Sequence, residues 1–375
     1  MKLVIAPDKF KGCLNARQVA EAIAAGVRDA RPDARIDLCP MADGGEGTVD
    51  ALVAATGGRT LTRRVTGPLP EMKVDAPFGI LGDGETAVVE MAAASGLHLL
   101  KPDQYDPMAT TTFGTGELLM AAAEMGVKRI ILGIGGSATI DGGIGCAQAC
   151  GLPVLLEGGE PVAMTEPLCG RDLESVLLVK HGRGSAIERV EIIVACDVTN
   201  PLYGEYGAAR VFGPQKGASP QDVEWFDRML HRLAQRTGKL EEALRPGAGA
   251  AGGLGFAMTA FFAARMRSGF HVVAEATRLK DRLAGADLCI TGEGRLDAQS
   301  LAGKTCIGVA RTCRDLGVPC VALVGSTGEG AEAATTEGLS HYLAIGHGLP
   351  LEESIRRAPE LLRSAASLVT VQSGT

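Results

Sequence analysis

In five places of this 375-residue chain a short apolar or β-branched run leads into a loop that carries an acidic side chain, and four of these five segments contain glycine. The segments are 3–12 (LVIAPDKFKG), 38–47 (LCPMADGGEG), 130–143 (IILGIGGSATIDGG), 192–202 (IIVACDVTNPL) and 288–297 (LCITGEGRLD). Glycine lets backbone N–H groups approach an anion closely, and a nearby carboxylate can bind a metal ion or accept a proton. This combination favours phosphoryl transfer with Mg²⁺, because that reaction depends on positioning and on charge neutralisation.

The elements that must position these loops are strands alternating with helices at the two ends of the chain. Predicted strands lie at 3–6, 36–39, 287–291, 318–324 and 341–345, and a helical pattern follows each of them. Asn15 with Gln18 three residues later predicts a capping box at the start of the first helix. Five parallel strands that alternate with helices predict one doubly wound, flavodoxin-like sheet.

The middle of the chain has a different pattern. Segments 63–65 and 72–81 predict an antiparallel hairpin, and helices at 116–125, 144–149 and 220–237 follow, with a strand at 191–196. We therefore expect residues 1–60 and 246–375, including a helix at 254–266, to form a discontinuous flavodoxin-like domain. Residues 61–245 are expected to form an inserted α/β (α+β) domain, and the active site is expected in the crevice between the two.

Bulk composition narrows the class of protein. A net charge of −7 argues against nucleic acid or an anionic membrane as a partner, so small-molecule substrates are expected. The ten cysteines include no C-x-x-C pair, which favours reduced, structural thiols. The sequence opens on a strand without a signal-like segment, and no apolar run approaches the ~20 residues of a membrane span. These features predict a cytoplasmic enzyme.

Segment 133–138 matches the G-x-G-x-x-G/A dinucleotide fingerprint, and Glu157 stands about twenty residues further on. Two features count against a nicotinamide cofactor. The loop continues to Gly143 before a helix can start, and Asp141 would face a pyrophosphate with no cation between them. Phosphate or substrate binding is therefore favoured, with a nicotinamide-dependent hydroxy-acid reductase as the alternative.

Two further segments carry charged groups that could act in catalysis. Residues 298–305 imitate a Walker A loop, but Ala298 replaces its first glycine and the preceding strand ends too far upstream. A P-loop is rejected, although Lys304 stays a candidate phosphate ligand at a helix start. Asp197 follows the apolar run 192–196, and an acid at the end of a strand is well placed to act as a general base or metal ligand.

Ten segments of the chain resemble the bacterial type 1 glycerate kinase family, in the same order and over nearly the whole length. They are APDKFKG (6–12), ADGGEGT (42–48), VTGPL (65–69), EMAAASGL (90–97), TTFGTGEL (111–118), GIGGSAT-DGG (133–143), ACDVTNPL-G (195–204), GPQKGA (213–218), PGAGAAGGLG (246–255) and TGEGRLDAQS-GK (291–304). The resemblance implies ATP-dependent phosphorylation of D-glycerate, usually at the 2-hydroxyl. It also implies a flavodoxin-like domain that carries an inserted α/β domain.

We expect an in-line phosphoryl transfer that uses ATP and Mg²⁺. Asp197 is expected to orient or deprotonate the glycerate hydroxyl, with Asp8 as the alternative base, and Lys11 is the third catalytic candidate. The candidate phosphate and substrate ligands are Gly135, Gly136, Ser137, Asp141, Lys216, Arg295 and Lys304, and the candidate metal ligands are Asp43, Glu46 and Asp297. A two-domain solute-binding protein is the non-enzymatic alternative.

One departure from the family touches the 133–143 loop, where Ile140 stands at a position that is commonly asparagine. Asparagine tolerates positive φ and offers an amide, whereas a β-branched isoleucine does neither. We expect the anion site to persist with one polar contact missing. If residue 140 faces the core instead, this departure has no functional meaning.

Overall fold

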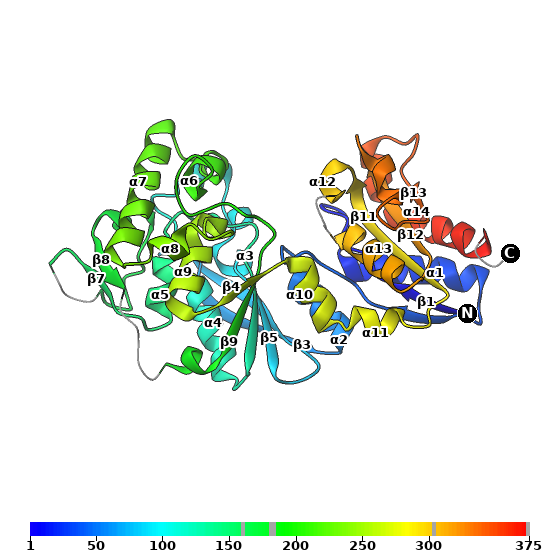
Figure 1. Ribbon diagram of the computed structural model, residues 1–375, viewed down its shortest axis with the longest axis horizontal. Helices are drawn as coiled ribbons and strands as arrows, with labels where there is room; N and C mark the ends of the chain where they lie inside the picture. Colours follow the sequence, from blue (N-terminus) through cyan, green and yellow to red (C-terminus); the bar gives the residue numbers. More distant parts are fainter. Residues whose placement is uncertain (159–161, 180–184, 302–304, 373–375) are drawn as a thin grey trace. The chain divides into compact units, whose positions relative to one another are not determined.

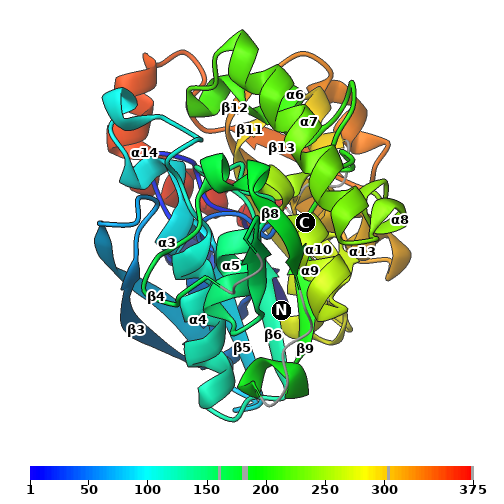
Figure 2. The same ribbon diagram turned by 90° about the vertical axis from the view of Figure 1, so that its left-hand side faces the viewer.

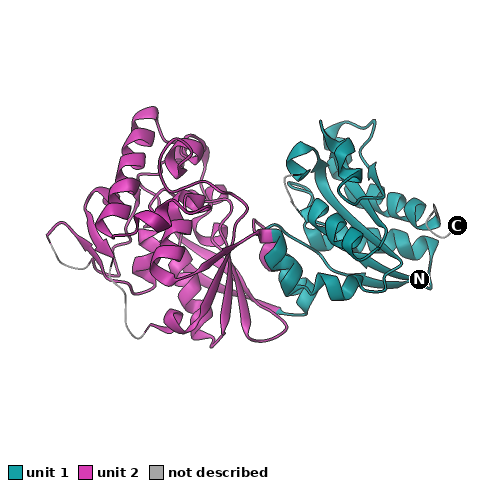
Figure 3. Cartoon of the chain, in the orientation of Figure 1, with its two compact units in different colours: residues 1–43, 50–58, 270–375 teal, residues 44–49, 59–269 magenta. Residues whose placement is uncertain are grey.

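The computed structural model describes residues 1–158, 162–179, 185–301 and 305–372 (Figure 1). These residues form two compact units, coloured separately in Figure 3. The first unit contains segments 1–43, 50–58 and 270–375, and the second contains segments 44–49 and 59–269. Each unit has its own sheet and its own hydrophobic core.

The first unit is built on a sheet of five parallel strands. They are β1 (Lys2–Ile5), β2 (Arg35–Leu38), β11 (Leu288–Leu296), β12 (Cys320–Thr327) and β13 (His341–Ala344). Their spatial order is β13-β12-β11-β1-β2, and every neighbouring pair is parallel. Counted along the chain, this is the 2-1-3-4-5 order of flavodoxin-like sheets. The predicted flavodoxin-like, five-stranded parallel sheet is therefore confirmed.

Helices cover both faces of this sheet. Successive side chains of a strand point to opposite faces and therefore pack against different helices. Leu288 and Ile290 face a core formed with α1 (Ala16–Ala30) and α14 (Leu351–Gln372), which pack against each other. Cys289, between them, faces α13 (Thr305–Asp315) on the other side. The remaining helices are α2 (Thr48–Thr56), α10 (Gly269–Ala276), α11 (Leu279–Leu283), α12 (Ala298–Leu301) and the 3₁₀ turn η7 (Ala331–Thr335).

Helix α1 begins at the capping box that the sequence predicts. The Asn15 Oδ1 atom accepts a hydrogen bond from the Gln18 N–H at 2.8 Å, and the Gln18 Oε1 atom accepts one from the Asn15 N–H at 3.0 Å. These two bonds satisfy backbone donors that the first turn of a helix leaves unpaired.

The second unit is built on a mixed sheet of six strands. They are β3 (Arg59–Thr66), β4 (Lys73–Ile80), β5 (Thr86–Glu90), β6 (Arg129–Gly133), β9 (Glu191–Ala195) and β10 (Arg265–Arg267), in the spatial order β10-β9-β6-β5-β4-β3. The pairs β10–β9, β9–β6 and β6–β5 are parallel, whereas β5–β4 and β4–β3 are antiparallel. The carboxyl ends of β5, β6 and β9 therefore lie along one edge.

Helix α4 packs on this sheet and contacts α5, as Figure 2 shows. The helices of the unit are α3 (Ala92–Ser95), α4 (Phe113–Glu124), α5 (Ile144–Ala149), α6 (Ala208–Phe212), α7 (Pro220–Arg236), α8 (Leu240–Ala243) and α9 (Leu254–Phe262). The 3₁₀ turns are η1 (Leu97–Leu99), η2 (Pro102–Gln104), η3 (Gly170–Glu174), η4 (Ala186–Arg189), η5 (Pro214–Lys216) and η6 (Ala250–Gly253). Strands β7 (Val154–Leu156) and β8 (Val176–Val179) form a separate two-stranded sheet.

The predicted helix at 254–266 is wrong in its last turn. Helix α9 ends at Phe262, because Ala263 adopts the left-handed conformation with φ 52°, and β10 then pairs with β9. Residues 246–269 pack in the second unit, although the sequence pattern placed them with the first domain.

Ile140 belongs to the hydrophobic core of the second unit, where its side chain is completely buried. We expected isoleucine at this position to deprive the anion site of one polar contact. That expectation is wrong, because the Ile140 side chain packs among apolar side chains of the core. The departure from the family at this position is a matter of packing.

We predict that Ile140→Asn lowers the free energy of unfolding by about 3–5 kcal/mol, because it removes buried apolar volume and buries an amide among apolar side chains. Urea denaturation measures this difference. Ile140→Val is the control and should cost only about 0.5–1.5 kcal/mol. An asparagine variant as stable as the parent would contradict the placement of residue 140 in the core.

Candidate active site

The acidic loop after β1 lies beside β11, which continues to Leu296 and so includes residues 292–296, a segment that the sequence pattern placed in a loop. The Asp8 N–H donates to the Gly292 carbonyl at 2.8 Å, which holds the loop after β1 beside the middle of β11. The Asp8 Oδ1 atom accepts the Lys9 N–H at 2.7 Å. Desolvation and the nearby Asp43 carboxylate raise the pKa of Asp8 to about 6. Asp8 can therefore exchange a proton near neutral pH.

The other predicted residues of the first unit lie around the same loops. The loop that carries Lys11 runs close to Gly294, and the Lys11 side chain is exposed. Arg295 Nε and Asp297 Oδ2 form an ion pair at 3.3 Å, and Asp297 Oδ1 accepts the Gln299 N–H at 2.9 Å at the start of α12. Asp297 thus has a structural role as a helix cap. Lys304 lies outside the described residues.

Segment 44–49 lies across the carboxyl ends of the second unit's parallel strands. Glu90, at the end of β5, accepts the Gly47 N–H at 3.2 Å and the Val49 N–H at 2.7 Å. A side chain at Gly133, at the end of β6, would overlap the carbonyl oxygen of Gly44. Glycine at position 133 therefore allows the backbone of β6 and the backbone of segment 44–49 to approach each other closely.

Asp43 and Glu46, both predicted metal ligands from this one loop, pack with different units. Asp43 is half-buried at the end of the 1–43 segment of the first unit. Glu46 is exposed and belongs to segment 44–49 of the second unit. The Asp43 and Glu46 carboxylates are therefore positioned by the packing of two different units.

The 133–143 loop is held by a completely buried carboxylate, that of Asp141. Its Oδ2 atom accepts hydrogen bonds from the Thr112 N–H at 2.8 Å and the Thr112 hydroxyl at 2.7 Å, and its Oδ1 atom accepts the Gly143 N–H at 3.0 Å. Desolvation raises the pKa of Asp141, and these hydrogen bonds oppose the rise. Asp141 thus fixes the end of the loop, which is a structural role.

Lys216, in η5, is buried against the same loop with an exposed fraction of 2%. Its ammonium nitrogen donates to the Ser137 hydroxyl oxygen at 2.6 Å and to the Thr139 carbonyl at 2.8 Å. Desolvation lowers the pKa of Lys216 to about 7, and the nearby Asp141 carboxylate partly opposes this shift. A lysine with this pKa can donate or accept a proton near neutral pH, or balance an arriving negative charge.

The structure brings four predicted ligands of this loop together with Lys216. Gly135 and Gly136 are exposed, whereas Ser137 is buried beneath them. The Gly136 carbonyl accepts the Leu97 N–H at 2.9 Å, so the loop is fixed on both sides. The exposed glycine backbone next to a buried lysine is an arrangement that suits a small anion.

Asp197 lies beyond the end of β9, and its side chain is exposed. Its Oδ1 atom accepts the Gly269 N–H at 2.9 Å, at the first residue of α10. This bond fixes the carboxylate just beyond the strand end.

Sequence reasoning did not select three residues that the structure adds. Glu90 anchors segment 44–49, and the Glu293 carboxylate lies near the Cys306 thiol, whose pKa it helps to raise. The Thr139 hydroxyl is buried and has no hydrogen-bond partner among the described residues. An acid at the end of the apolar run 86–90 was the available signal for Glu90, but no glycine follows it closely.

One further cavity of the described residues lies away from these loops. A cavity of about 520 Å³ lies at the amino ends of β1 and β2, where Arg282 pairs with Asp37. That is the edge opposite to the acidic loops. The ten cysteines are free thiols, as predicted. No helix in the described ranges is long and apolar enough to cross a membrane.

We predict that the stability difference between the parent and Lys216→Met changes with pH. The unfolded lysine keeps an ordinary pKa near 10.5 while the folded one titrates at about 7, so the unfolded chain binds more protons between these values. The parent should therefore gain stability relative to the variant as pH rises above 7, and the difference should be constant at lower pH. Urea denaturation from pH 6 to 9.5 measures it.

Lys128→Met is the matched control, because Lys128 is an exposed lysine in an ion pair with Glu85. Its stability difference should stay nearly constant over the same pH range. A pH-independent difference for Lys216→Met would show that Lys216 keeps an ordinary pKa in the folded chain.

Comparison with known proteins identifies the family. The model of the glycerate kinase family matches residues 3–372. A glycerate kinase of Halalkalibacterium halodurans is 45% identical over 99% of this chain and 98% of its own, and the glycerate 2-kinase of Escherichia coli K12 is 43% identical over 96% and 94%. A crystal structure assigned to glycerate kinase 2 of Salmonella typhimurium LT2 is 44% identical, with a TM-score of 0.88 over 99% of this chain and 98% of that one. The chain therefore belongs to the glycerate kinase family.

Proposed function

We propose that the chain transfers the γ-phosphoryl group of ATP to the 2-hydroxyl of D-glycerate, giving 2-phosphoglycerate and ADP. Its family makes it an enzyme, a kinase that acts on glycerate. The observation that carries the finer assignment is the relative named glycerate 2-kinase, 43% identical over 96% of this chain. The acidic residues and glycine-rich segments at the ends of parallel strands support phosphoryl transfer as the type of reaction.

The 133–143 loop is proposed to bind an anionic group of the substrates. Gly135 and Gly136 would offer backbone N–H groups, and the Ser137 hydroxyl is held by Lys216. Lys216 is fully desolvated, so a negative charge arriving beside it would raise its pKa and draw a proton to it. Lys11, Arg295 and Lys304 are proposed to offset the remaining charge of the γ-phosphate and the glycerate carboxylate.

Mg²⁺ fits the carboxylates of the first unit. The Asp43 carboxylate lies close enough to Asp8 to raise the pKa of Asp8, and two such oxygen donors suit a hard divalent cation. Mg²⁺ usually takes one or two carboxylates and completes its shell with waters and phosphates. Asp43 is therefore the first proposed ligand, with Asp297 of the same unit and Glu46 of segment 44–49 as further candidates. When bound, the ion would neutralise charge on the phosphate oxygens.

Asp197 is proposed to orient or deprotonate the glycerate hydroxyl. Its side chain is exposed just beyond the end of β9, and the Gly269 N–H fixes its carboxylate there. Asp8 is the alternative base, because its pKa of about 6 suits proton exchange at neutral pH.

Product analysis tests the proposed reaction. Purified protein is mixed with Mg-ATP and D-glycerate, ADP release is followed, and ³¹P NMR identifies the phosphorylated product. We expect stoichiometric ADP and 2-phosphoglycerate. A product phosphorylated at the 3-hydroxyl would overturn the regiochemistry, and absence of glycerate-dependent ADP release would overturn the reaction itself. A parallel assay of NADH oxidation tests the reductase alternative.

We predict that Asp197→Asn lowers kcat by about 10²–10⁴, the usual contribution of general acid–base catalysis. The asparagine Oδ1 atom can still accept the Gly269 N–H, so the fold and the KM for ATP should change little. Steady-state kinetics and thermal denaturation measure the two effects.

Asp227→Asn is the matched control, because Asp227 Oδ1 likewise accepts a backbone N–H, that of Gly204, at 2.8 Å. This variant should keep near-parental turnover. If Asp197→Asn also keeps it, Asp197 is a structural cap of α10 and Asp8 becomes the proposed base.

A further inference from the structure

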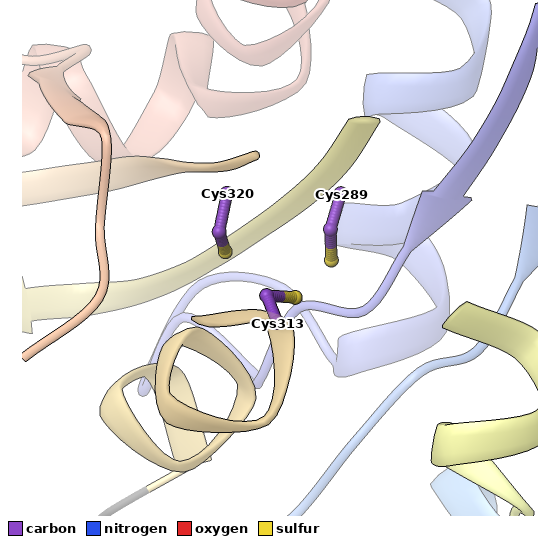
Figure 4. A group of neighbouring side chains, drawn as sticks. All are labelled: Cys289, Cys313 and Cys320. Atoms are coloured by element: carbon purple, nitrogen blue, oxygen red, sulfur yellow. The ribbon is translucent and has the colours of Figure 1, made fainter. Parts of the chain in front are cut away.

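Three thiols converge inside the first unit, apart from the acidic loops. Cys289 of β11 and Cys320 of β12 are direct partners in the parallel register, and Cys313 comes from α13, which packs over these strands. Figure 4 shows their sulfur atoms pointing toward one another. The three Sγ atoms lie within 4.8 Å of one another, and all three side chains have an exposed fraction of 0%.

This spacing matches the sulfur cage of a three-coordinate metal ion. Metal–sulfur bonds are about 2.3 Å long in thiolate sites, so three sulfurs around one ion in a plane lie about 4 Å apart. The upper limit of 4.8 Å on the sulfur separations is compatible with that geometry. The cluster is the one group of three potential metal-ligating His, Cys, Asp or Glu side chains that the described residues bring this close together.

We propose that Cys289, Cys313 and Cys320 form a binding site for one thiophilic monovalent cation, Cu⁺. Thiolate ligands select soft ions such as Cu⁺ and Zn²⁺ over hard ones. Zn²⁺ in structural sites takes four ligands, whereas Cu⁺ accepts three. The nearby buried thiol of Cys39 is engaged elsewhere, since it donates to the Met41 sulfur at 3.8 Å. Three converging sulfurs therefore favour Cu⁺.

Charge balance permits such a site in an apolar core. One S–H bond breaks as one Cu–S bond forms with the resulting thiolate, and the released proton goes to solvent. The other two sulfurs bind through lone pairs, and no electron changes hands. Because Cu⁺ replaces the proton of one thiol while the other two sulfurs stay protonated, the core gains no net charge, which avoids the large cost of burying an unpaired ion.

The site is closed to solvent in the folded chain, so loading is tested in two ways. The full-length protein is incubated under anaerobic, reducing conditions with Cu⁺ held by the chromophoric chelator bicinchoninate, and a second sample is refolded from urea in the same solution. Loss of the chelate colour measures Cu⁺ transfer to the protein. We expect one equivalent of Cu⁺ per chain in the refolded sample and an increased melting temperature.

Cys313→Ala should weaken Cu⁺ binding at least ~10-fold, since even outer partners of metal ligands contribute that much to affinity. Cys313→Ser is the second variant if the alanine variant fails to fold, as judged by circular dichroism. Cys306→Ala is the matched control, because Cys306 is a completely buried thiol on the same helix outside the cluster. It should bind Cu⁺ as the parent does.

Three results would overturn the proposal. The first is a refolded parent that takes up no Cu⁺. The second is a Cys313 variant that binds Cu⁺ as tightly as the parent, which would place binding at another thiol. The third is an equal loss of binding in Cys306→Ala, which would reduce the effect to a general loss of packing. In each case the three cysteines are ordinary small core residues.

Discussion

The close approach of segment 44–49 to the strand ends of the second unit is the constraint on which the candidate site depends. Gly133 leaves room for the Gly44 carbonyl, and a side chain at Gly44 itself would lie 2.8 Å from the Ala195 Cβ atom. Glu90 then fixes the segment through two backbone N–H groups. Because the chain on either side of 44–49 belongs to the first unit, one loop supplies Asp43 to one unit and Glu46 to the other.

The two charged side chains that hold the 133–143 loop, those of Asp141 and Lys216, are buried. Asp141 and Lys216 are both inaccessible to solvent, and each is compensated by hydrogen bonds: Asp141 by Thr112 and Gly143, Lys216 by Ser137 and Thr139. Such groups are costly to bury unless they are paired, so they are usually kept for a function. Gly135 and Gly136 stay exposed, and the next residue, Ser137, is buried and accepts a hydrogen bond from the Lys216 ammonium group.

Much of this organisation could be predicted from the sequence, and the failures have physical causes. The order of the five parallel strands follows from regular alternation of strands and helices, and the α1 capping box from Asn15 and Gln18. Strand β10 (RMR) has no apolar pattern, and only its pairing with β9 makes it a strand. Glu90 lacked the glycines that marked the other loops. The direction of the Ile140 side chain depends on core packing, which local sequence does not encode.

The cluster of Cys289, Cys313 and Cys320 could not be predicted from the sequence either. Cys289 and Cys320 meet through strand register, and Cys313 reaches them because α13 crosses that face of the sheet. No spacing rule for metal ligands covers such a set, since the residues converge through tertiary structure alone. Strand β11 carries Cys289 near its amino end and, further along, Gly292, whose carbonyl accepts the Asp8 N–H. The position of this strand between β1 and β12 therefore determines the geometry of both the sulfur cluster and the acidic loops.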